Sequence, residues 1–129
     1  MQDEKGQATV EFALVIPFLM LVLLVLVQTG LAMHAQIMVT QAAREGARQA
    51  TTADSDGEII QAVKKSASGL DPSRLDVAYQ APHGWRAGQP VTVTVRYHMP
   101  IFVPLVKTIF PNFVVLKGST TMRIEKERK

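Results

Sequence analysis

The chain has 129 residues, of which 47% are hydrophobic, and its 14 basic and 11 acidic side chains give a net charge of +3. That length fits one domain, or one domain with an anchor, and the composition excludes collagen-like, coiled-coil and fully disordered classes. The absence of cysteine excludes disulfide frameworks, thiolate zinc sites, iron–sulfur clusters and cysteine nucleophiles. The small positive charge indicates a solvated, mildly basic surface, and no nucleic-acid partner is expected.

An uncharged apolar segment extends from Phe12 to Met33, and the next charged residue after Glu11 is Arg44. A helix of this length rises about 33 Å, which matches the roughly 30 Å hydrocarbon core of a bilayer. Pro17 lies inside the segment, and membrane helices tolerate proline as a kink or near the helix start. A buried core helix would need more partner surface than the rest of the chain offers. The segment therefore predicts a membrane-spanning helix.

Three kinds of N-terminal apolar segment have to be separated: a cleaved signal peptide, a plain signal anchor and a pilin-type leader. The first residues, MQDEK, hold two acids and one base, whereas a signal peptide begins with a basic region. A small-x-small site ending at Ala32 keeps open a secreted binding domain released there. Lys5 precedes the span, whereas Arg44 and Arg48 follow it. Because the side with more basic residues is usually cytoplasmic, the positive-inside rule, taken alone, places the C-terminal domain in the cytoplasm.

Glu11 lies at the edge of the apolar segment, where a carboxylate is costly unless it is neutralised or paired. If the chain were cut after Gly6, the new α-amine of Gln7 would be a cation at a similar membrane depth. The amine of a neighbouring subunit would then be a partner for Glu11. From the residues alone, two interpretations are equally favoured: Glu11 pairs with this amine, or Glu11 simply lies among the lipid headgroups.

The stretch GQATVEFALVIPFLMLVLLVLVQTG at 6–30, followed by QAAREGARQA at 41–50, resembles the TadE-like family of pilin-related proteins. These are minor pilins or pseudopilins of tight-adherence (Tad/Flp) pilus systems. The resemblance implies that a prepilin peptidase cuts between Gly6 and Gln7 and that Glu11 belongs to the recognition signal. It also implies insertion in the bacterial inner membrane, with the N-terminus cytoplasmic and the C-terminal domain extracytoplasmic.

The resemblance divides the chain into a leader at 1–6, a transmembrane and extended helix at 7–50, and a small α+β extracytoplasmic domain at 51–129. It implies a structural function, in which the subunit packs through its N-terminal helix in a Tad pilus or assists its assembly. The implied partners are other pilin and pseudopilin subunits, the prepilin peptidase, the inner-membrane assembly platform and the lipid bilayer. The alternative is an uncleaved, single-pass anchored binding or sensor module that works outside any filament.

Small residues continue beyond Met33 at three- and four-residue steps, so the helix is expected to run on to about Ala50. This stripe of alanine and glycine packs either on the chain's own sheet or, near Gly30 and Gly46, against the helices of other subunits. The turn-rich stretch at 51–57 then ends the helix.

The rest of the chain predicts one short helix and about three antiparallel strands, which makes the expected fold class α+β and pilin-like. The helix is expected from about Gly57 to Ser68, with Asp56 as its cap. Alternating apolar and polar residues predict strands at 75–79, 90–98 and 115–125.

An apolar, proline-rich stretch at 99–113 separates the last two strands, and its only charge is Lys107. An apolar loop of this size does not stand free in water. It is expected either to cover the core or to pack on a partner subunit or the membrane surface, which makes it the best candidate interaction surface. The candidate contact residues are Ile101, Phe102, Val103, Leu105, Ile109 and Phe110.

The sequence carries no recognisable catalytic or metal-binding pattern, so neither an enzyme activity, a metal nor a cofactor is expected. His34, His83 and His98 lack metal-ligand spacing. The DSDG stretch at 54–57 lacks the downstream glutamate of a calcium loop. The tail at 123–129 alternates in charge and is expected to be a solvated end.

Overall fold

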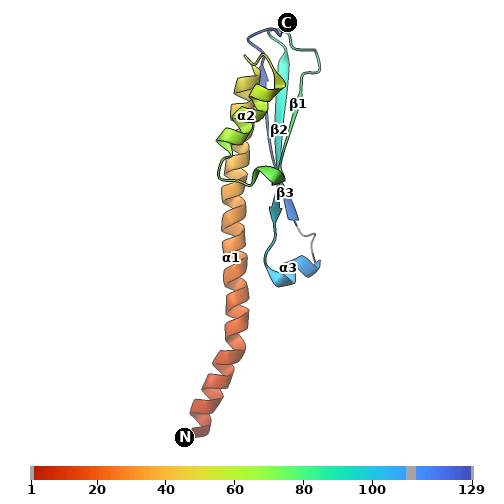
Figure 1. Ribbon diagram of the computed structural model, residues 1–129. Coiled ribbons are helices and arrows are strands. Elements are labelled where there is room, and N and C mark those ends of the chain that lie inside the picture. Colours follow the sequence, from red (N-terminus) through yellow and green to blue (C-terminus); the bar gives the residue numbers. More distant parts are fainter. Residues whose placement is uncertain (1, 110–112, 129) are drawn as a thin grey trace.

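The computed structural model describes residues 2–109 and 113–128. A long helical stem carries a small sheet and a second helix along its C-terminal half, and the N-terminus lies at the far end of the stem (Figure 1). The elements are α1 (Gln2–Ala50), α2 (Asp56–Ser66), the 3-10 turn η1 (Pro72–Arg74), β1 (Leu75–Gln80), β2 (Pro90–Pro100), α3 (Pro104–Ile109) and β3 (Phe113–Arg123). The predicted α+β class is confirmed.

Helix α1 is continuous over 49 residues, and a helix of that length is about 73 Å long. It includes Pro17, whose ring crowds the preceding turn and whose nitrogen cannot donate a hydrogen bond. Proline inside a helix causes a bend of the kind visible in the N-terminal part of the stem (Figure 1). The predicted extension to Ala50 is confirmed, and the residues of the expected leader are part of the same helix.

The three strands form one antiparallel sheet in the order β1-β2-β3. On the face of β2 that is turned to the helices, Val91, Val93 and Val95 are buried. On the opposite face, the hydroxyls of Thr92 and Thr121 lie 2.8 Å apart across β2 and β3. The predicted alternation is therefore confirmed, and β2 extends two residues beyond its expected end at His98.

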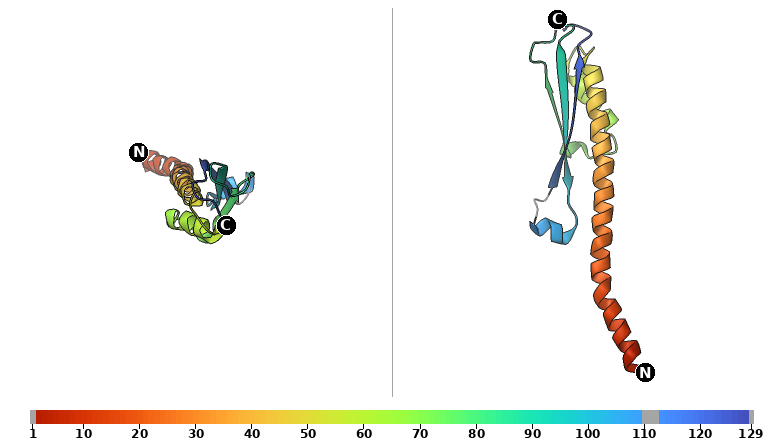
Figure 2. Two further views of the ribbon diagram at one scale, coloured as in Figure 1. Left: turned by 90° about the horizontal axis from the view of Figure 1, so that it is seen from above. Right: turned by 180° about the vertical axis from the view of Figure 1, so that it is seen from behind.

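The hydrophobic core lies between the sheet, α2 and the C-terminal half of α1 (Figure 2). The stem contributes a stripe of small side chains to it: Ala35, Val39, Ala42, Ala43, Ala47 and Ala50. Ile59 and Val63 of α2 cover the same stripe. A Cβ on Gly46 would lie 2.5 Å from Val63 Cγ2, so this glycine serves the chain's own packing and not a neighbouring subunit. In the described part of the chain, the Cβ position of Gly30 has no atom within 4 Å.

Strand β3 approaches the backbone of α1 closely at Gly118, which is buried. A Cβ on this glycine would lie 2.9 Å from the carbonyl oxygen of Val39 and 3.0 Å from the Cα of Thr40. Next to it, the side-chain amide of Gln36 donates a hydrogen bond of 2.9 Å to the carbonyl of Lys117. These contacts fix the position of β3 along the stem.

Two expectations about local structure are wrong. Asp56 does not cap α2: Ser55 is the N-cap residue, in an extended conformation and without a side-chain capping hydrogen bond, and Asp56 is the first helical residue. The stretch at 99–113 is not a loop throughout, because β2 continues to Pro100 and α3 begins at Pro104. Proline suits the first turn of a helix, where its missing N–H has no partner to lose.

The tail is exposed at Arg123, Glu125, Lys126 and Glu127, in line with the expected solvated end. It is nevertheless attached to the turn between α1 and α2 by contacts of Lys126 and Arg128, which we call the clip. The guanidinium of Arg128 lies over the Trp85 ring, 3.5 Å from its centroid. Its Nε donates a 3.1 Å hydrogen bond to the carbonyl of Ala53, and its Nη1 donates to the carboxylate of Asp56. Lys126 also contacts this turn through its backbone N–H, which donates to the carbonyl of Thr51 at 2.9 Å.

This clip predicts a loss of stability in acid. Hydrogen bonds from Arg128 and then Tyr79 lower the pKa of Asp56 below its ordinary value of 3.8. The pKa of Asp56 is lower in the folded state than in the unfolded state, so the ionised carboxylate stabilises the fold. This stabilisation is fully present above the unfolded-state pKa and is lost as the pH falls through the folded-state pKa. Urea unfolding of the detergent-solubilised chain should therefore show a smaller loss of stability from pH 5 to pH 2 in Asp56→Asn than in the wild type.

Asp71 offers a matched control, because its pKa is also lowered, by hydrogen bonds from Ser73 within its own turn. Asp71→Asn should leave the protection of the Lys126 amide from hydrogen exchange unchanged at neutral pH. Asp56→Asn should reduce that protection. Equal protection of the amide in both variants would contradict the clip.

Candidate functional site

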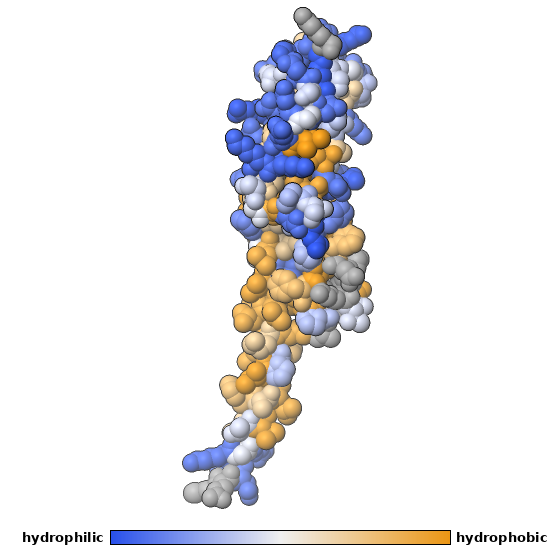
Figure 3. All heavy atoms as spheres, viewed as in Figure 1, coloured by the Kyte–Doolittle hydropathy of each residue, from blue (hydrophilic) through white to orange (hydrophobic). Residues whose placement is uncertain are grey.

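The N-terminal half of α1 presents the most distinctive surface of the described chain. It contains one stretch that is long and apolar enough to cross a membrane, and none of that stretch is buried against the rest of the chain. Large side chains such as Phe12, Leu14 and Phe18 are 63%, 74% and 65% exposed. Figure 3 shows apolar residues along the stem above its polar N-terminal end and continuing upward to the base of the sheet, while polar residues dominate the far end of the domain. An exposed apolar surface of this size is typical of a site that contacts a membrane or another protein.

The predicted processing junction lies in the first turns of α1. Gly6, Gln7 and Glu11 are all helical and exposed. The side-chain amide of Gln7 donates a hydrogen bond of 3.4 Å to Oε1 of Glu11, one helical turn away. The structure thus brings Gln7 and Glu11 together on one face of the stem, within a single chain.

The six candidate contact residues of the 99–113 stretch divide into two groups. Ile101 and Val103 are buried, at 4% and 1% exposure, whereas Phe102 and Ile109 are 39% and 76% exposed. Phe110 and the side chain of Leu105 lie outside the described part of the structure. The stretch therefore contributes both to the interior and to the apolar surface.

Sequence analysis missed two features of this region. Val114 and Val115 at the start of β3 are 45% and 47% exposed and extend the apolar surface beyond Phe113, the last residue of the 99–113 stretch; the signal for them was a run of apolar residues without alternation. The second missed feature is Gln28, whose side chain is a lone amide inside the apolar segment. Its Nε2 donates to the carbonyl of Pro100 and its Oε1 accepts from the N–H of Phe102, both at 3.3 Å. This amide ties the end of β2 to the stem.

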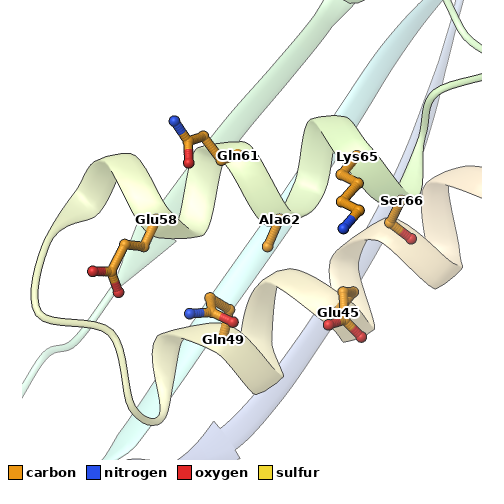
Figure 4. A pocket seen from close by; sticks show the side chains of 7 residues that line it. All are labelled: Glu45, Gln49, Glu58, Gln61, Ala62, Lys65 and Ser66. Carbon is orange, nitrogen blue, oxygen red and sulfur yellow. The ribbon is translucent and has the colours of Figure 1, made fainter.

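A polar groove of about 570 Å³ lies between α1 and α2. Its lining residues are Glu45, Gln49, Glu58, Gln61, Ala62, Lys65 and Ser66 (Figure 4). Lys65 extends from α2 toward α1, and the carboxylate of Glu58 points away from Lys65 (Figure 4). The groove is open and of mixed charge. Within residues 2–109 and 113–128, the acids and histidines form no group of three that could hold a metal ion.

His98 and His34 have different surroundings. Nε2 of His98 lies 3.0 Å from a carboxylate oxygen of Asp76 on β1, and its ring packs against Phe113 in a T-shaped arrangement. His34 lines an apolar cavity between the stem and β2.

Comparison with known proteins gives one match: the family model described as TadE-like protein matches residues 6–48. A search of curated proteins and a search of solved structures found no match. The matched segment begins at Gly6, includes the exposed apolar stretch and ends in the last turn of α1. The resemblance seen at 6–30 and 41–50 is therefore confirmed, and the match does not extend to α2 or the sheet. Residues 6–48, which make up most of the helical stem, carry the signature of TadE-like proteins.

Proposed function

We propose that the chain is a structural subunit of a Tad pilus system, inserted in the bacterial inner membrane by α1 and processed by a prepilin peptidase after Gly6. The observation that carries this proposal is the overlap of the family match with the exposed apolar stem, because residues 6–48 include the whole of the apolar stretch. TadE-like proteins are associated with Tad pili, and an uncovered apolar helix is the part of such a subunit that other helices can pack against.

The exposed side chains of the stem support this mechanism. In the membrane, lipid covers them, and in an assembled pilus the helices of other pilin and pseudopilin subunits would cover them instead. In lipid, helices associate through close packing and polar contacts more than through the hydrophobic effect. Gly30, which lies at the end of the uncovered part of the stem, is available for such packing.

Processing would change the charge at the start of the stem. Loss of residues 1–6 removes Asp3, Glu4 and Lys5, a net charge of −1, and creates an α-amine on Gln7. Glu11 lies one turn along the helix from Gln7, so the amine and the carboxylate differ in depth by only about 6 Å. When subunits pack side by side, the amine of one chain can pair with Glu11 of the next, and this pairing reduces the cost of a carboxylate in an apolar setting.

The proposed role is structural and not catalytic. The apolar stem is suited to contact with lipids and helices and not to bond-breaking chemistry. The partners that follow are the prepilin peptidase, the inner-membrane assembly platform and the other subunits of the pilus. In this topology the sheet domain lies outside the cytoplasmic membrane.

The test is the N-terminal sequence of the chain in the membranes of its host and of a host strain without prepilin peptidase. The chain should begin at Gln7 in the first strain and still carry residues 1–6 in the second. Identical N-termini in the two strains would contradict processing by this peptidase.

A further inference from the structure

The end of the sheet domain that is nearer the N-terminal half of α1 is apolar. We define the sheet tip as its exposed side chains: Phe102, Ile109, Phe113, Val114 and Val115. In Figures 1 and 2 this end, with α3, lies alongside the middle of the stem and not at the end of the stem where the core is. The position of the tip along α1 therefore decides whether it meets water or lipid.

Gln28 gives a first measure of that position. It lies 16 residues after Phe12, the first residue of the apolar segment, and this separation is about 24 Å along the helix. A hydrocarbon core of about 30 Å that begins at Phe12 therefore ends about 6 Å beyond Gln28. Because the amide of Gln28 bonds to Pro100 and Phe102, this part of the tip lies at the same depth.

Strand β3 gives a second measure, through a different contact. Gln36 bonds to the carbonyl of Lys117, and Gln36 lies about 36 Å along the helix from Phe12. Phe113 is four residues before Lys117 on a strand that runs along the stem (Figure 1), which brings it about 13 Å closer to the membrane. Phe113 then lies about 23 Å from Phe12, in agreement with the depth of Gln28.

The distribution of charge changes at the same height. Lys117, whose carbonyl is held by Gln36, is the first charged residue on β3 and lies about 6 Å outside the hydrocarbon boundary. The hydrogen-bonding contact of His98 with Asp76 lies close to that boundary, because His98 is paired with Val115 in the sheet register. Between Met99 and Leu116 the sequence holds one charge, at Lys107. The protein surface therefore becomes apolar where the surrounding medium is expected to do so.

An apolar cavity of about 230 Å³ between the stem and β2 opens at this level. Leu31, Met99 and Phe102 are among its lining residues, and Phe102 also belongs to the sheet tip. The uncovered stem, this cavity and the tip thus form one continuous apolar surface.

We propose that the sheet tip is seated in the outer leaflet of the bilayer while the subunit resides in the membrane. A depth of about 6 Å is typical of segments that insert at the boundary between headgroups and acyl chains. The amide of Gln28, which would otherwise be unsatisfied in hydrocarbon, hydrogen-bonds to the backbone of the tip. The sheet domain is then fixed on the membrane by two attachments, the stem and the tip. This inference rests on the proposed membrane placement of α1, but not on cleavage or pilus assembly.

The test uses the full chain in liposomes of phosphatidylcholine and phosphatidylglycerol, with and without brominated acyl chains. The chain has no cysteine, so single cysteines can carry an environment-sensitive fluorophore at one chosen site. Ile109 is the reporter, because at 76% exposure its replacement disturbs little of the packing. Leu23 in the apolar stem is the positive control, and Thr121 on the outward face of β3 is the negative control.

We expect brominated lipid to quench the fluorophore at Ile109 and at Leu23 by several-fold more than the one at Thr121, at every protein-to-lipid ratio. If the fluorophore at position 23 is quenched but the one at position 109 is quenched no more than the one at position 121, the seated tip is overturned. The membrane placement of α1 would remain intact. A fluorophore at position 109 whose emission is blue-shifted but not quenched, and whose signal depends on protein density, would also overturn the seated tip. That result would show that a second copy of the chain covers the tip. No quenching at Leu23 would overturn the membrane placement itself, and with it this inference.

Discussion

Replacing Glu11 with alanine should reduce surface pili to the background of a strain that lacks the chain, while the chain remains inserted in the membrane. Glu11 lies exposed at the edge of the apolar stem, one turn after Gln7. Its removal eliminates the proposed partner of a neighbouring subunit's α-amine but makes the helix more apolar, so insertion is not impaired. Electron microscopy of cells counts the pili, and carbonate extraction followed by immunoblotting measures the inserted chain.

Glu4→Ala is the matched control, because this acid lies in the segment that processing removes. It should leave the number of pili unchanged. Glu11→Gln keeps the shape of the side chain and removes its charge, so it should behave like Glu11→Ala if an ion pair is the essential contact. Normal pilus numbers from Glu11→Ala would contradict the pairing. A Glu11→Ala chain that is absent from the membrane would contradict a role confined to assembly.

The second large effect is expected at Gly118. Gly118→Ala should lower the free energy of unfolding by about 1–3 kcal/mol, the usual cost of adding a methyl group to a site without room. The new Cβ would meet the backbone of Val39 and Thr40 at 2.9–3.0 Å, and backbone atoms in a packed helix cannot move aside as a flexible side chain can. Urea unfolding followed through Trp85, the sole tryptophan, measures the change.

Gly57→Ala separates this effect from the general consequences of replacing a glycine. A Cβ on Gly57, near the start of α2, would meet only the hydroxyl oxygen of Ser55 at 3.9 Å. Replacing a helical glycine by alanine in open space stabilises a protein by about 0.4–1 kcal/mol. The two variants should therefore shift the unfolding midpoint in opposite directions. A Gly118→Ala variant as stable as the wild type would show that β3 can move away from α1 at no cost.

The elements that could be predicted from the sequence are those encoded by local periodicity. The small-residue steps up to Ala50 predict the end of α1, and the alternation around Val93 predicts a strand with one buried face. The clip at Asp56 could not be predicted, because it depends on Arg128 reaching the turn between α1 and α2 from 72 residues away. Local pattern makes Asp56 a plausible helix cap, and only the folded chain shows that its carboxylate has another partner.

The candidate site was predictable to a similar degree. Gly6, Gln7 and Glu11 stand out because a short charged segment meets a long apolar one. The 99–113 stretch stands out as apolar, but its height along the stem is not encoded locally. That height follows from two long-range contacts, of Gln28 with Pro100 and of Gln36 with Lys117, which join residues more than seventy positions apart. An isolated glutamine in an apolar helix was the only signal of the first contact.

The most direct test of the pilin-like function is the intact mass of the chain purified from the native membrane fraction of its host. The expected mass is that of the full sequence without residues 1–6, with Gln7 as the first residue. A chain that still carries Met1–Gly6 in cells with an active prepilin peptidase would contradict it. That result would favour an uncleaved, membrane-anchored binding module, and would leave Glu11 without its proposed partner.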